Sequence, residues 1–142
     1  MKIKLLNDLA KVPTRGSEES AGWDLYAAIE QDIKILPHTT EKIGTGIAIE
    51  LPRGTFGAVY ARSGLATKQG LRPANAVGVI DSDYRGEVIV ALHNDSDHIR
   101  IIRPGDRIAQ LVVTLYVSGD MTIVESLSGT ERGNKGFGST GV

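Results

Sequence analysis

The feature that most constrains the fold is an alternation of apolar and polar residues with a period of two, repeated along most of the chain. Such alternation is typical of a half-buried β-strand, because successive side chains of a strand point to opposite faces. The chain has 14 isoleucines and 11 valines but only 5% aromatic residues, so we expect an aliphatic core built of strands. The clearest windows are Lys42–Leu51, Thr55–Arg62, Glu87–Asn94, His98–Ile102 and Ile108–Val117, and shorter ones are Ile3–Leu6, Asp32–Leu36, Val77–Ile80 and Thr122–Glu125.

Helical periodicity is nearly absent. Only Leu65–Gln69, between Gly64 and Gly70, predicts a helix, of about one and a half turns, and Ser63 is placed to cap its N-terminus. Clusters of proline, glycine, asparagine and aspartate separate the predicted strands, as in a sandwich, jelly roll or barrel. We therefore expect an all-β, jelly-roll-like barrel or sandwich with one short helix, in which Ile108–Val117, apolar on both faces, is a central strand.

The length of 142 residues predicts a single domain, and the sequence shows no internal repeat or linker. The composition changes after Ser128, where five glycines fall within fourteen residues. We expect a β-domain over residues 1–128 that carries the functional site, followed by a flexible glycine-rich arm over residues 129–142. By composition alone this arm is typical of a disordered tail.

Several classes of protein are disfavoured by composition. No apolar run approaches the roughly 18 residues that cross a bilayer, and the N-terminus lacks the apolar run of a secretory signal, so we expect a cytoplasmic protein without a membrane partner. The absence of cysteine excludes disulfides, a thiol nucleophile and thiolate metal sites. A net charge of −1 argues against a nucleic-acid polymer as partner.

Three predicted loops combine glycine with residues that carry chemistry. Asp24, within Ala21–Ala28, is either a turn residue or a ligand for a hard cation such as Mg²⁺. Arg62-Ser63-Gly64, where a strand gives way to the helix, is either a capped turn or a phosphate site. Asn75–Glu87 has the pattern of a hairpin, in which Asp81 either decorates the turn or serves as a general base for water.

The glycine-rich arm forms a fourth candidate. Its charged and hydroxyl residues are of types that bind phosphate, and the glycines between them allow backbone contact. Phe137 has no core to join there, but it could stack on a planar base. The combination favours a flap that closes over a nucleotide, with phosphate donors at Arg132, Lys135, Ser139 and Thr140.

Five segments in order resemble the five motifs of the trimeric dUTPase family: Ala21–Leu25, Ala61–Ala66, Gly78–Gly86, Arg103–Leu111 and Arg132–Gly141. One such motif is a weak signal, but five in order over most of the chain are a strong one. The resemblance implies a jelly-roll-like protomer in a homotrimer, with three active sites formed between chains. It also implies Mg²⁺-dependent hydrolysis of dUTP to dUMP and pyrophosphate, which removes dUTP and supplies the precursor of dTMP.

The resemblance also assigns roles to single residues. Asp24 would hold the Mg²⁺-triphosphate through a metal-bound water. Asp81 would orient and deprotonate the water that attacks the α-phosphorus, and Tyr84 would pack under the deoxyribose and leave no room for a 2′-hydroxyl. The phosphates would be bound by Arg62, Ser63, Gly64 and Gln110.

Uracil would be recognised in the hairpin and covered by the arm. The hairpin residues that would bind it, largely through backbone groups, are Asn75, Val79, Ile80, Asp81 and Ile89. In the arm, Phe137 would lie over the uracil and Arg132 and Ser139 would bind the γ-phosphate, with Gly138 completing the substrate-binding set.

Two positions depart from the family pattern, because Trp23 stands where tyrosine is common and Ala61 where proline is common. We expect changed packing there rather than lost activity.

Two other functions compete: a dCTP deaminase, which has the same general fold and a glutamate near the base, and a non-catalytic binding module. Ile80–Tyr84 resembles the hydrolase pattern, and the presence of Asp24, Asp81 and the arm motif argues against the module.

Overall fold

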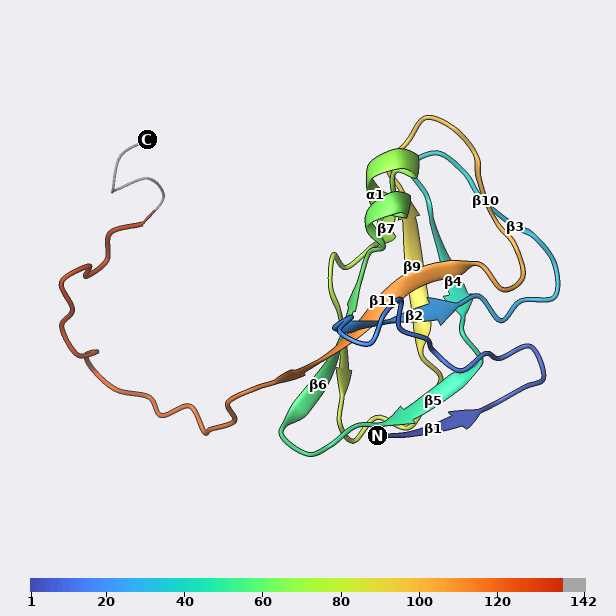
Figure 1. Cartoon of the computed structure of the whole chain (residues 1–142). Coiled ribbons are helices and arrows are strands. Elements are labelled where there is room, and N and C mark those ends of the chain that lie inside the picture. The colour runs from blue at the N-terminus through green and yellow to red at the C-terminus, as the bar shows by residue number, and fades with distance from the viewer. Residues whose placement is uncertain (137–142) are drawn as a thin grey trace.

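Strands dominate the structure, as the alternation predicted. The computed structural model describes residues 1–136. Along the chain its elements are β1 (Lys2–Leu5), β2 (Gly22–Tyr26), β3 (Ile33–Ile35), β4 (Thr40–Gly44), β5 (Ile47–Glu50), β6 (Thr55–Tyr60), α1 (Ser63–Gln69), β7 (Leu71–Pro73), β8 (Gly78–Asp81), β9 (Ile89–Asn94), β10 (Arg100–Ile102) and β11 (Arg107–Leu115). The described residues form an all-β, jelly-roll-like body with one short helix (Figure 1).

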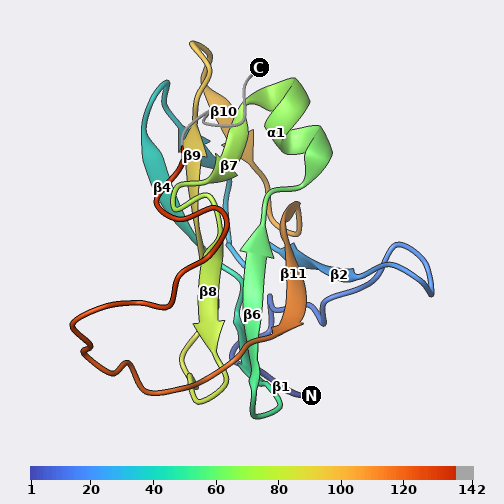
Figure 2. The same ribbon diagram turned by 90° about the vertical axis from the view of Figure 1, so that its left-hand side faces the viewer.

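Four antiparallel sheets make up the body. The largest has the strand order β2-β11-β6-β8, and a second has the order β4-β9-β7. Two ribbons, β1-β5 and β10-β3, complete it. β11 is the longest strand and lies between β2 and β6, which confirms the predicted central strand. In the view of Figure 2, β6, β8 and β11 stand side by side, with α1 above them.

A single aliphatic core lies between these sheets. It draws Leu25 from β2, Ile43 from β4, Ile80 from β8, Leu92 from β9 and Leu111 from β11 into one buried cluster. The alternation explains the choice of side chains, because Val88, Val90 and Leu92 share the buried face around β9. β10 also alternates, but it buries Ile102, so Ile99 and Ile101, which the pattern of His98–Ile102 places together on an apolar face, are exposed. The core fixes β8 and β9, which carry much of the predicted site.

Three strand predictions need correction. Lys42–Leu51 is two strands, because the backbone turns at Gly46, whose φ is +66°. A side chain there would also crowd Ala10 and Asn7. Thr122–Glu125 forms no strand, and Gly22–Tyr26, treated as a loop in the sequence, is β2. In each case local alternation could not reveal which segments find a partner strand.

The helix forms where it was predicted but is capped differently. Ser63 is its first residue and Arg62 its N-cap, without a hydrogen bond from a capping side chain. At the other end Gly70 adopts the left-handed conformation, with φ of +68°, and its N–H closes the last turn on Ala66. This is the usual role of glycine at a helix C-terminus.

After β11 the chain leaves the body. Residues 116–136 contain no helix or strand and run away from the sheets (Figure 1). Several large apolar side chains of this segment are almost fully exposed, namely Val117, Met121, Ile123 and Leu127. Within residues 1–136, no helix has the length and apolar character needed to cross a membrane.

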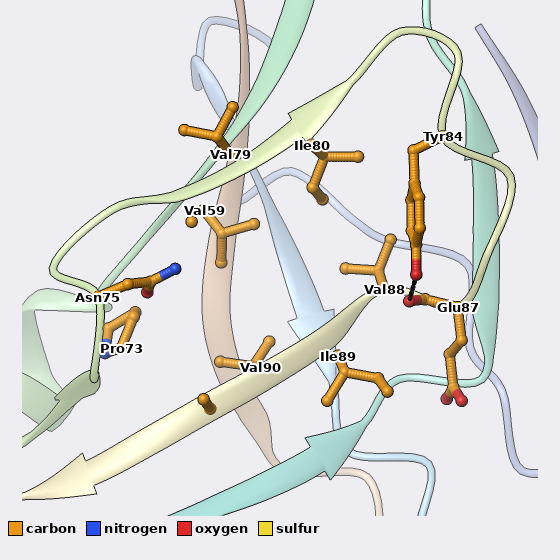
Figure 3. Close-up of a pocket in the computed structure, with 12 residues that line it drawn as sticks. Val59, Pro73, Asn75, Val79, Ile80, Tyr84, Glu87, Val88, Ile89 and Val90 are labelled. Carbon is orange, nitrogen blue, oxygen red and sulfur yellow. Dashed lines mark hydrogen bonds between the residues drawn. The ribbon is translucent and has the colours of Figure 1, made fainter.

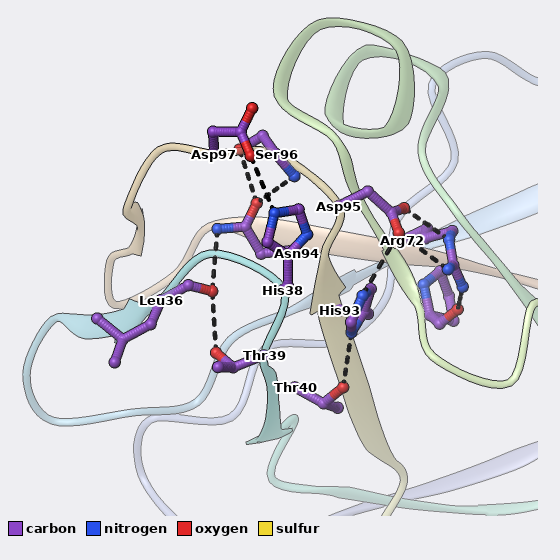
Figure 4. A network of polar contacts seen from close by, with 11 residues as sticks. Leu36, His38, Thr39, Thr40, Arg72, His93, Asn94, Asp95, Ser96 and Asp97 are labelled. Carbon is purple, nitrogen blue, oxygen red and sulfur yellow. Dashed lines mark hydrogen bonds and ion pairs between the residues drawn. The ribbon is translucent and has the colours of Figure 1, made fainter.

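Buried Asn94 ties the loops at one end of the second sheet together (Figure 4). Its side-chain amide donates to the carbonyls of Ile35, Leu36 and His98, at 3.1, 3.2 and 2.8 Å. Beside it, Arg72 of β7 donates two hydrogen bonds to Asp95, at 2.7 and 3.0 Å. These bonds fix the end of β7, whose last residue lines the cavity described next.

Candidate functional site

A cavity of about 230 Å³ opens between β8 and β9 (Figure 3). Asn75 and Tyr84 stand at its two ends, and apolar side chains form its walls (Figure 3). The cavity thus gathers five of the predicted substrate-binding residues: Asn75, Val79, Ile80, Tyr84 and Ile89.

Free strand edges explain why a planar ring could bind there. β8 is the outer strand of its sheet and pairs only with β6. β9 pairs with β7 over Leu92–Asn94, and Ala91 accepts the N–H of Ala74 at 2.8 Å, so among residues 1–136 Ile89 has no partner on that side. An unpaired edge presents backbone N–H and C=O groups that can pair with another chain or with a ligand.

The turn that follows β8 is held by its own hydrogen bonds. The N–H of Tyr84 donates to the carbonyl of Asp81 at 3.1 Å. The Arg85 guanidinium donates to the carbonyls of Ser82 and Tyr84, at 2.7 and 2.9 Å. These bonds fix the positions of the Asp81 and Tyr84 side chains relative to β8.

Asp81 does not line the cavity, although the residue before it, Ile80, does. Asp81 is the last residue of β8, pairs with Phe56, and is exposed, whereas the preceding Ile80 is buried. Asp81 lines an adjacent open hollow of about 570 Å³, together with Arg53, Asp83 and Tyr116. The carboxylate can therefore meet solvent water, as a general base must.

A second group of predicted residues meets around Asp24, which is 4% exposed on β2. One carboxylate oxygen accepts hydrogen bonds from Arg62 Nε at 3.0 Å and Gln110 Nε2 at 3.4 Å. The other accepts one from Arg107 at 3.0 Å. We call Asp24, Arg62, Arg107 and Gln110 the arginine cluster.

The arginine cluster has an excess of positive charge at its open side. Two guanidinium groups share one carboxylate, and each guanidinium has five N–H donors. The side chains of Arg62 and Arg107 are 25% and 50% exposed, so donors remain free for an anion. Next to them lies a hollow of about 310 Å³ that Arg62, Arg103 and Arg107 line. Charge and geometry suit a polyphosphate.

Ser63 and Gly64 are exposed on the first turn of α1, beside Arg62. The space where a Gly64 side chain would lie is open. Arg132 lies in the segment after β11, where its Nε donates to the carbonyl of Lys135 at 3.2 Å, and within residues 1–136 no hydrogen bond joins it to either group. The predicted residues Phe137, Gly138 and Ser139 lie outside the described residues.

Within one chain, Asp81 and Arg62 lie at opposite ends of β6. Asp81 pairs with Phe56 at the start of β6, whereas Arg62 follows the other end of that strand. From Phe56 to Arg62 the extended chain advances by six residues, at about 3.3 Å each, which separates the two positions by roughly 20 Å. Asp81 and Arg62 of one chain are therefore too far apart to act on neighbouring phosphates.

Comparison with known proteins decides the family, because the dUTPase family model matches residues 8–141. The chain belongs to the dUTPase family. It is similar to the deoxyuridine 5'-triphosphate nucleotidohydrolase of Desulfitobacterium hafniense (strain DSM 10664 / DCB-2), with 50% identity over 93% of this chain and 88% of that protein. A probable deoxyuridine 5'-triphosphate nucleotidohydrolase of Schizosaccharomyces pombe is 48% identical over 99% of this chain and 97% of its own.

Solved dUTPase structures have the same fold. A variant of the Staphylococcus bacteriophage 80alpha dUTPase with dUpNHpp has a TM-score of 0.90 at 30% identity, covering 99% of this chain and 98% of that one. A variant of the dUTPase from phage phi11 of S. aureus, described with a structural Mg(II) ion, has a TM-score of 0.78 at 26% identity, covering 88% and 96%. The chain is thus an enzyme of the dUTPase fold and family.

Arg107 is the site residue that the sequence did not reveal. It lies within the dUTPase-like segment Arg103–Leu111, but alternation puts it on the face opposite Gln110. In the structure β11 bulges, since Arg107 pairs with Tyr26 while Ala109 pairs with the preceding Leu25. The extra residue reverses the alternation and turns Arg107 toward Asp24.

The donor set around Asp24 fits only some modes of magnesium binding. Among residues 1–136, no three His, Asp or Glu side chains gather around a common point. Both Asp24 oxygens are bonded to cationic or amide donors, which disfavours direct coordination of a cation. The site is compatible with Mg²⁺ that is coordinated by phosphate oxygens and keeps several water ligands. One of these waters could donate a hydrogen bond to Asp24.

Proposed function

We propose that this chain hydrolyses dUTP to dUMP and pyrophosphate with Mg²⁺, by attack of water on the α-phosphorus. The observation that carries the proposal is the cavity between β8 and β9, which has free strand edges, Tyr84 at one end, and Asp81 directly after Ile80 of its wall. The reaction would remove dUTP and supply the precursor of dTMP.

The cavity would hold the nucleoside. Uracil has one N–H donor and two carbonyl acceptors on its pairing edge, which match the backbone groups of β8 and β9 near Val79, Asp81 and Ile89. The Asn75 amide, at the far end, would supply a further donor or acceptor. Tyr84 would pack against the deoxyribose, where its ring leaves no space for a 2′-hydroxyl.

Asp81 would act as the general base. Its carboxylate takes one proton from water while the water oxygen bonds to the α-phosphorus, and the bond from that phosphorus to the bridging oxygen breaks, releasing pyrophosphate. Such reactions depend mainly on positioning and on charge stabilisation, so the chain needs no covalent nucleophile. When bound, Mg²⁺ would supply positive charge that offsets the charge of the phosphates.

The arginine cluster would bind the phosphate chain. Arg62 and Arg107 donate to phosphate oxygens, and Asp24 holds both guanidinium groups in a fixed orientation. Gln110, Ser63 and the Gly64 backbone would add neutral donors. Asp24 would contact the Mg²⁺ through a metal-bound water.

The distance between Asp81 and Arg62 supports sites shared between chains of a homotrimer. In that assembly the cavity of one protomer would face the arginine cluster of another, so one dUTP would span both. Because the segment after β11 runs away from its own body, Arg132 and the predicted Phe137, Gly138 and Ser139 would close over a neighbour's site.

Mixing two inactive variants tests the shared site. Asp81→Asn and Arg62→Ala each lack one half, but in mixed trimers one protomer supplies Asp81 and its neighbour supplies Arg62. Activity should return after the two are unfolded and refolded together, to about a quarter of the wild-type value for random equal mixing. No recovery would show that both residues act within one chain.

A substrate panel tests the reaction itself. Pyrophosphate and ammonia would be measured from dUTP, dCTP, dTTP and UTP, with and without Mg²⁺. We expect Mg²⁺-dependent release of pyrophosphate from dUTP, with poor use of dCTP, dTTP and UTP. Ammonia from dCTP would instead identify a deaminase, and tight binding without turnover a binding module. Against the deaminase, Glu87 at the cavity wall has its carboxylate bonded to the N–H of Gly46 at 2.8 Å.

A further inference from the structure

The ring of Tyr84 is held in place by the two residues that follow its turn. Its hydroxyl donates to the carbonyl of Glu87 at 3.1 Å (Figure 3). The ring lies over Gly86, because a side chain at that position would collide with the ring and hydroxyl of Tyr84. The orientation of Tyr84 therefore depends on where the Glu87 carbonyl lies.

The side chain of Glu87 is docked on a different element, the turn between β4 and β5. Its Oε1 accepts the N–H of Gly46 at 2.8 Å. It also fills the space beside Gly44, where a Cβ atom would lie 2.7 Å from Oε1. Since ordinary Cβ contacts are longer, this half-buried carboxylate occupies a notch that exists because position 44 is glycine.

The next residue is fixed to the same turn. The N–H of Val88 donates to the carbonyl of Ile47 at 2.8 Å, and the buried Thr45 donates to the carbonyl of Val88 through both its N–H and its hydroxyl. The peptide between Glu87 and Val88 is therefore held from both sides, by the Glu87 carboxylate and by the Val88 backbone. That peptide carries the carbonyl that Tyr84 contacts.

We propose that Glu87 is a positioning residue that sets the orientation of Tyr84 and, through it, the preference for a deoxyribose over a ribose nucleotide. The inference rests on the proposed function, since it names what controls the sugar-facing residue of that site. Hydrogen bonding and side-chain length matter, not charge: in the described chain Glu87 forms no ion pair. Glutamine keeps the side-chain length and the acceptor oxygen, so Glu87→Gln should preserve the orientation of Tyr84.

Sugar selectivity is the decisive kinetic measurement. In Glu87→Ala the ratio of kcat/KM for dUTP to that for UTP should fall about tenfold, and Glu87→Gln should stay within about twofold of wild type. If Glu87 had a purely structural role, Glu87→Ala would lower kcat/KM for dUTP and for UTP by the same factor and leave the ratio unchanged. An unchanged ratio in Glu87→Ala, or an equal loss in the glutamine variant, would overturn the proposal.

Gly44→Ala provides an independent test from the opposite strand. Its methyl group would push the carboxylate out of the notch while Glu87 stays in the sequence. We expect the same loss of selectivity, and no additional loss when Gly44→Ala is combined with Glu87→Ala. Additive losses would show that the two residues do not act through one contact.

Fluorine NMR separates this proposal from the proposed function. The chain has four tyrosines, so 3-fluorotyrosine labelling gives few signals, and Tyr84→Phe assigns the one of interest. Glu87→Ala should shift this signal toward that of a free tyrosine, whereas Glu87→Gln should not. An unmoved signal refutes the contact even if dUTP is hydrolysed, and a moved signal supports it even if dUTP is not the substrate.

Discussion

The cavity between β8 and β9 and the arginine cluster differ in how they are built. The cavity comes mostly from one stretch of sequence, residues 75–91, and uses backbone edges and apolar walls. The arginine cluster joins side chains from three separate segments, around Asp24, Arg62 and Arg107, and uses charge. One region suits a planar base, the other an anion.

The difference teaches what each region can tolerate. Backbone groups of the cavity remain when side chains change, so single substitutions there should weaken binding moderately. The arginine cluster depends on one buried carboxylate that orients two guanidinium groups, so its loss should affect every phosphate contact together.

Asp81→Asn should separate binding from chemistry and have the largest effect. We expect turnover of dUTP to fall about 10³-fold, because the general base is lost, while dUTP still binds in the intact cavity. Single-turnover kinetics and equilibrium binding measure the two quantities. Asp83→Asn, in the same turn, is the matched control and should remain active; near-normal turnover in Asp81→Asn would remove it as the base.

Asp24→Asn should break the arginine cluster and leave the cavity intact. Loss of the shared carboxylate frees Arg62 and Arg107 to move, so kcat/KM for dUTP should fall about 100-fold. Calorimetry with inorganic tripolyphosphate should show weaker binding, and binding of deoxyuridine should not change. Asp8→Asn, at an exposed aspartate far along the chain from the cluster, is the control; equal weakening of both ligands would refute the division between base and phosphate.

Asn75→Ala should weaken binding of the base and leave phosphate binding unchanged, the reverse of Asp24→Asn, and its effect should be smaller. Removal of the amide at the end of the cavity should raise KM for dUTP about tenfold, since one polar contact to the base is lost. Affinity for tripolyphosphate should stay at the wild-type value. A change in tripolyphosphate binding would mean that the two regions are coupled within one chain.

Asp95→Asn should have the smallest effect, a loss of thermal stability. Asp95 helps to fix β7, whose last residue lines the cavity. Hydrogen bonds from Arg72 lower the pKa of Asp95 below its ordinary value. A carboxyl with a lowered pKa stabilises the fold above its unfolded pKa, near about 3.9, and this contribution is lost as pH falls through the folded pKa. The thermal midpoint of wild type should exceed that of the variant at pH 7, and the two should converge in acid.

Much of the fold was predictable because burial produces a local signal. The alternation of Val88, Val90 and Leu92 identified β9, and the apolar faces of Ile108–Val117 identified the central strand. Pairing is not local, so the strand nature of Gly22–Tyr26 went unnoticed and Thr122–Glu125 was wrongly predicted as a strand.

For the candidate site, sequence motifs named residues but could not group them. That Asn75 and Tyr84 share a cavity follows from one short segment, but the hairpin predicted there is wrong, because β8 and β9 lie in different sheets and do not pair. That Asp81 and Arg62 lie at opposite ends of β6 follows from strand register, which no motif contains. The importance of Glu87 was hidden because its partners, Gly44 and Gly46, lie on a distant turn.

The bulge in β11 has a consequence for how this sequence can vary over time. Substitutions along β11 change one contact each, but deletion of Ile108, the residue between Arg107 and Ala109, would remove the bulge together with a side chain that is fully buried in the core. Among related sequences, insertions and deletions should therefore accumulate in the loops and be excluded from this short stretch, where the residue count itself is under selection.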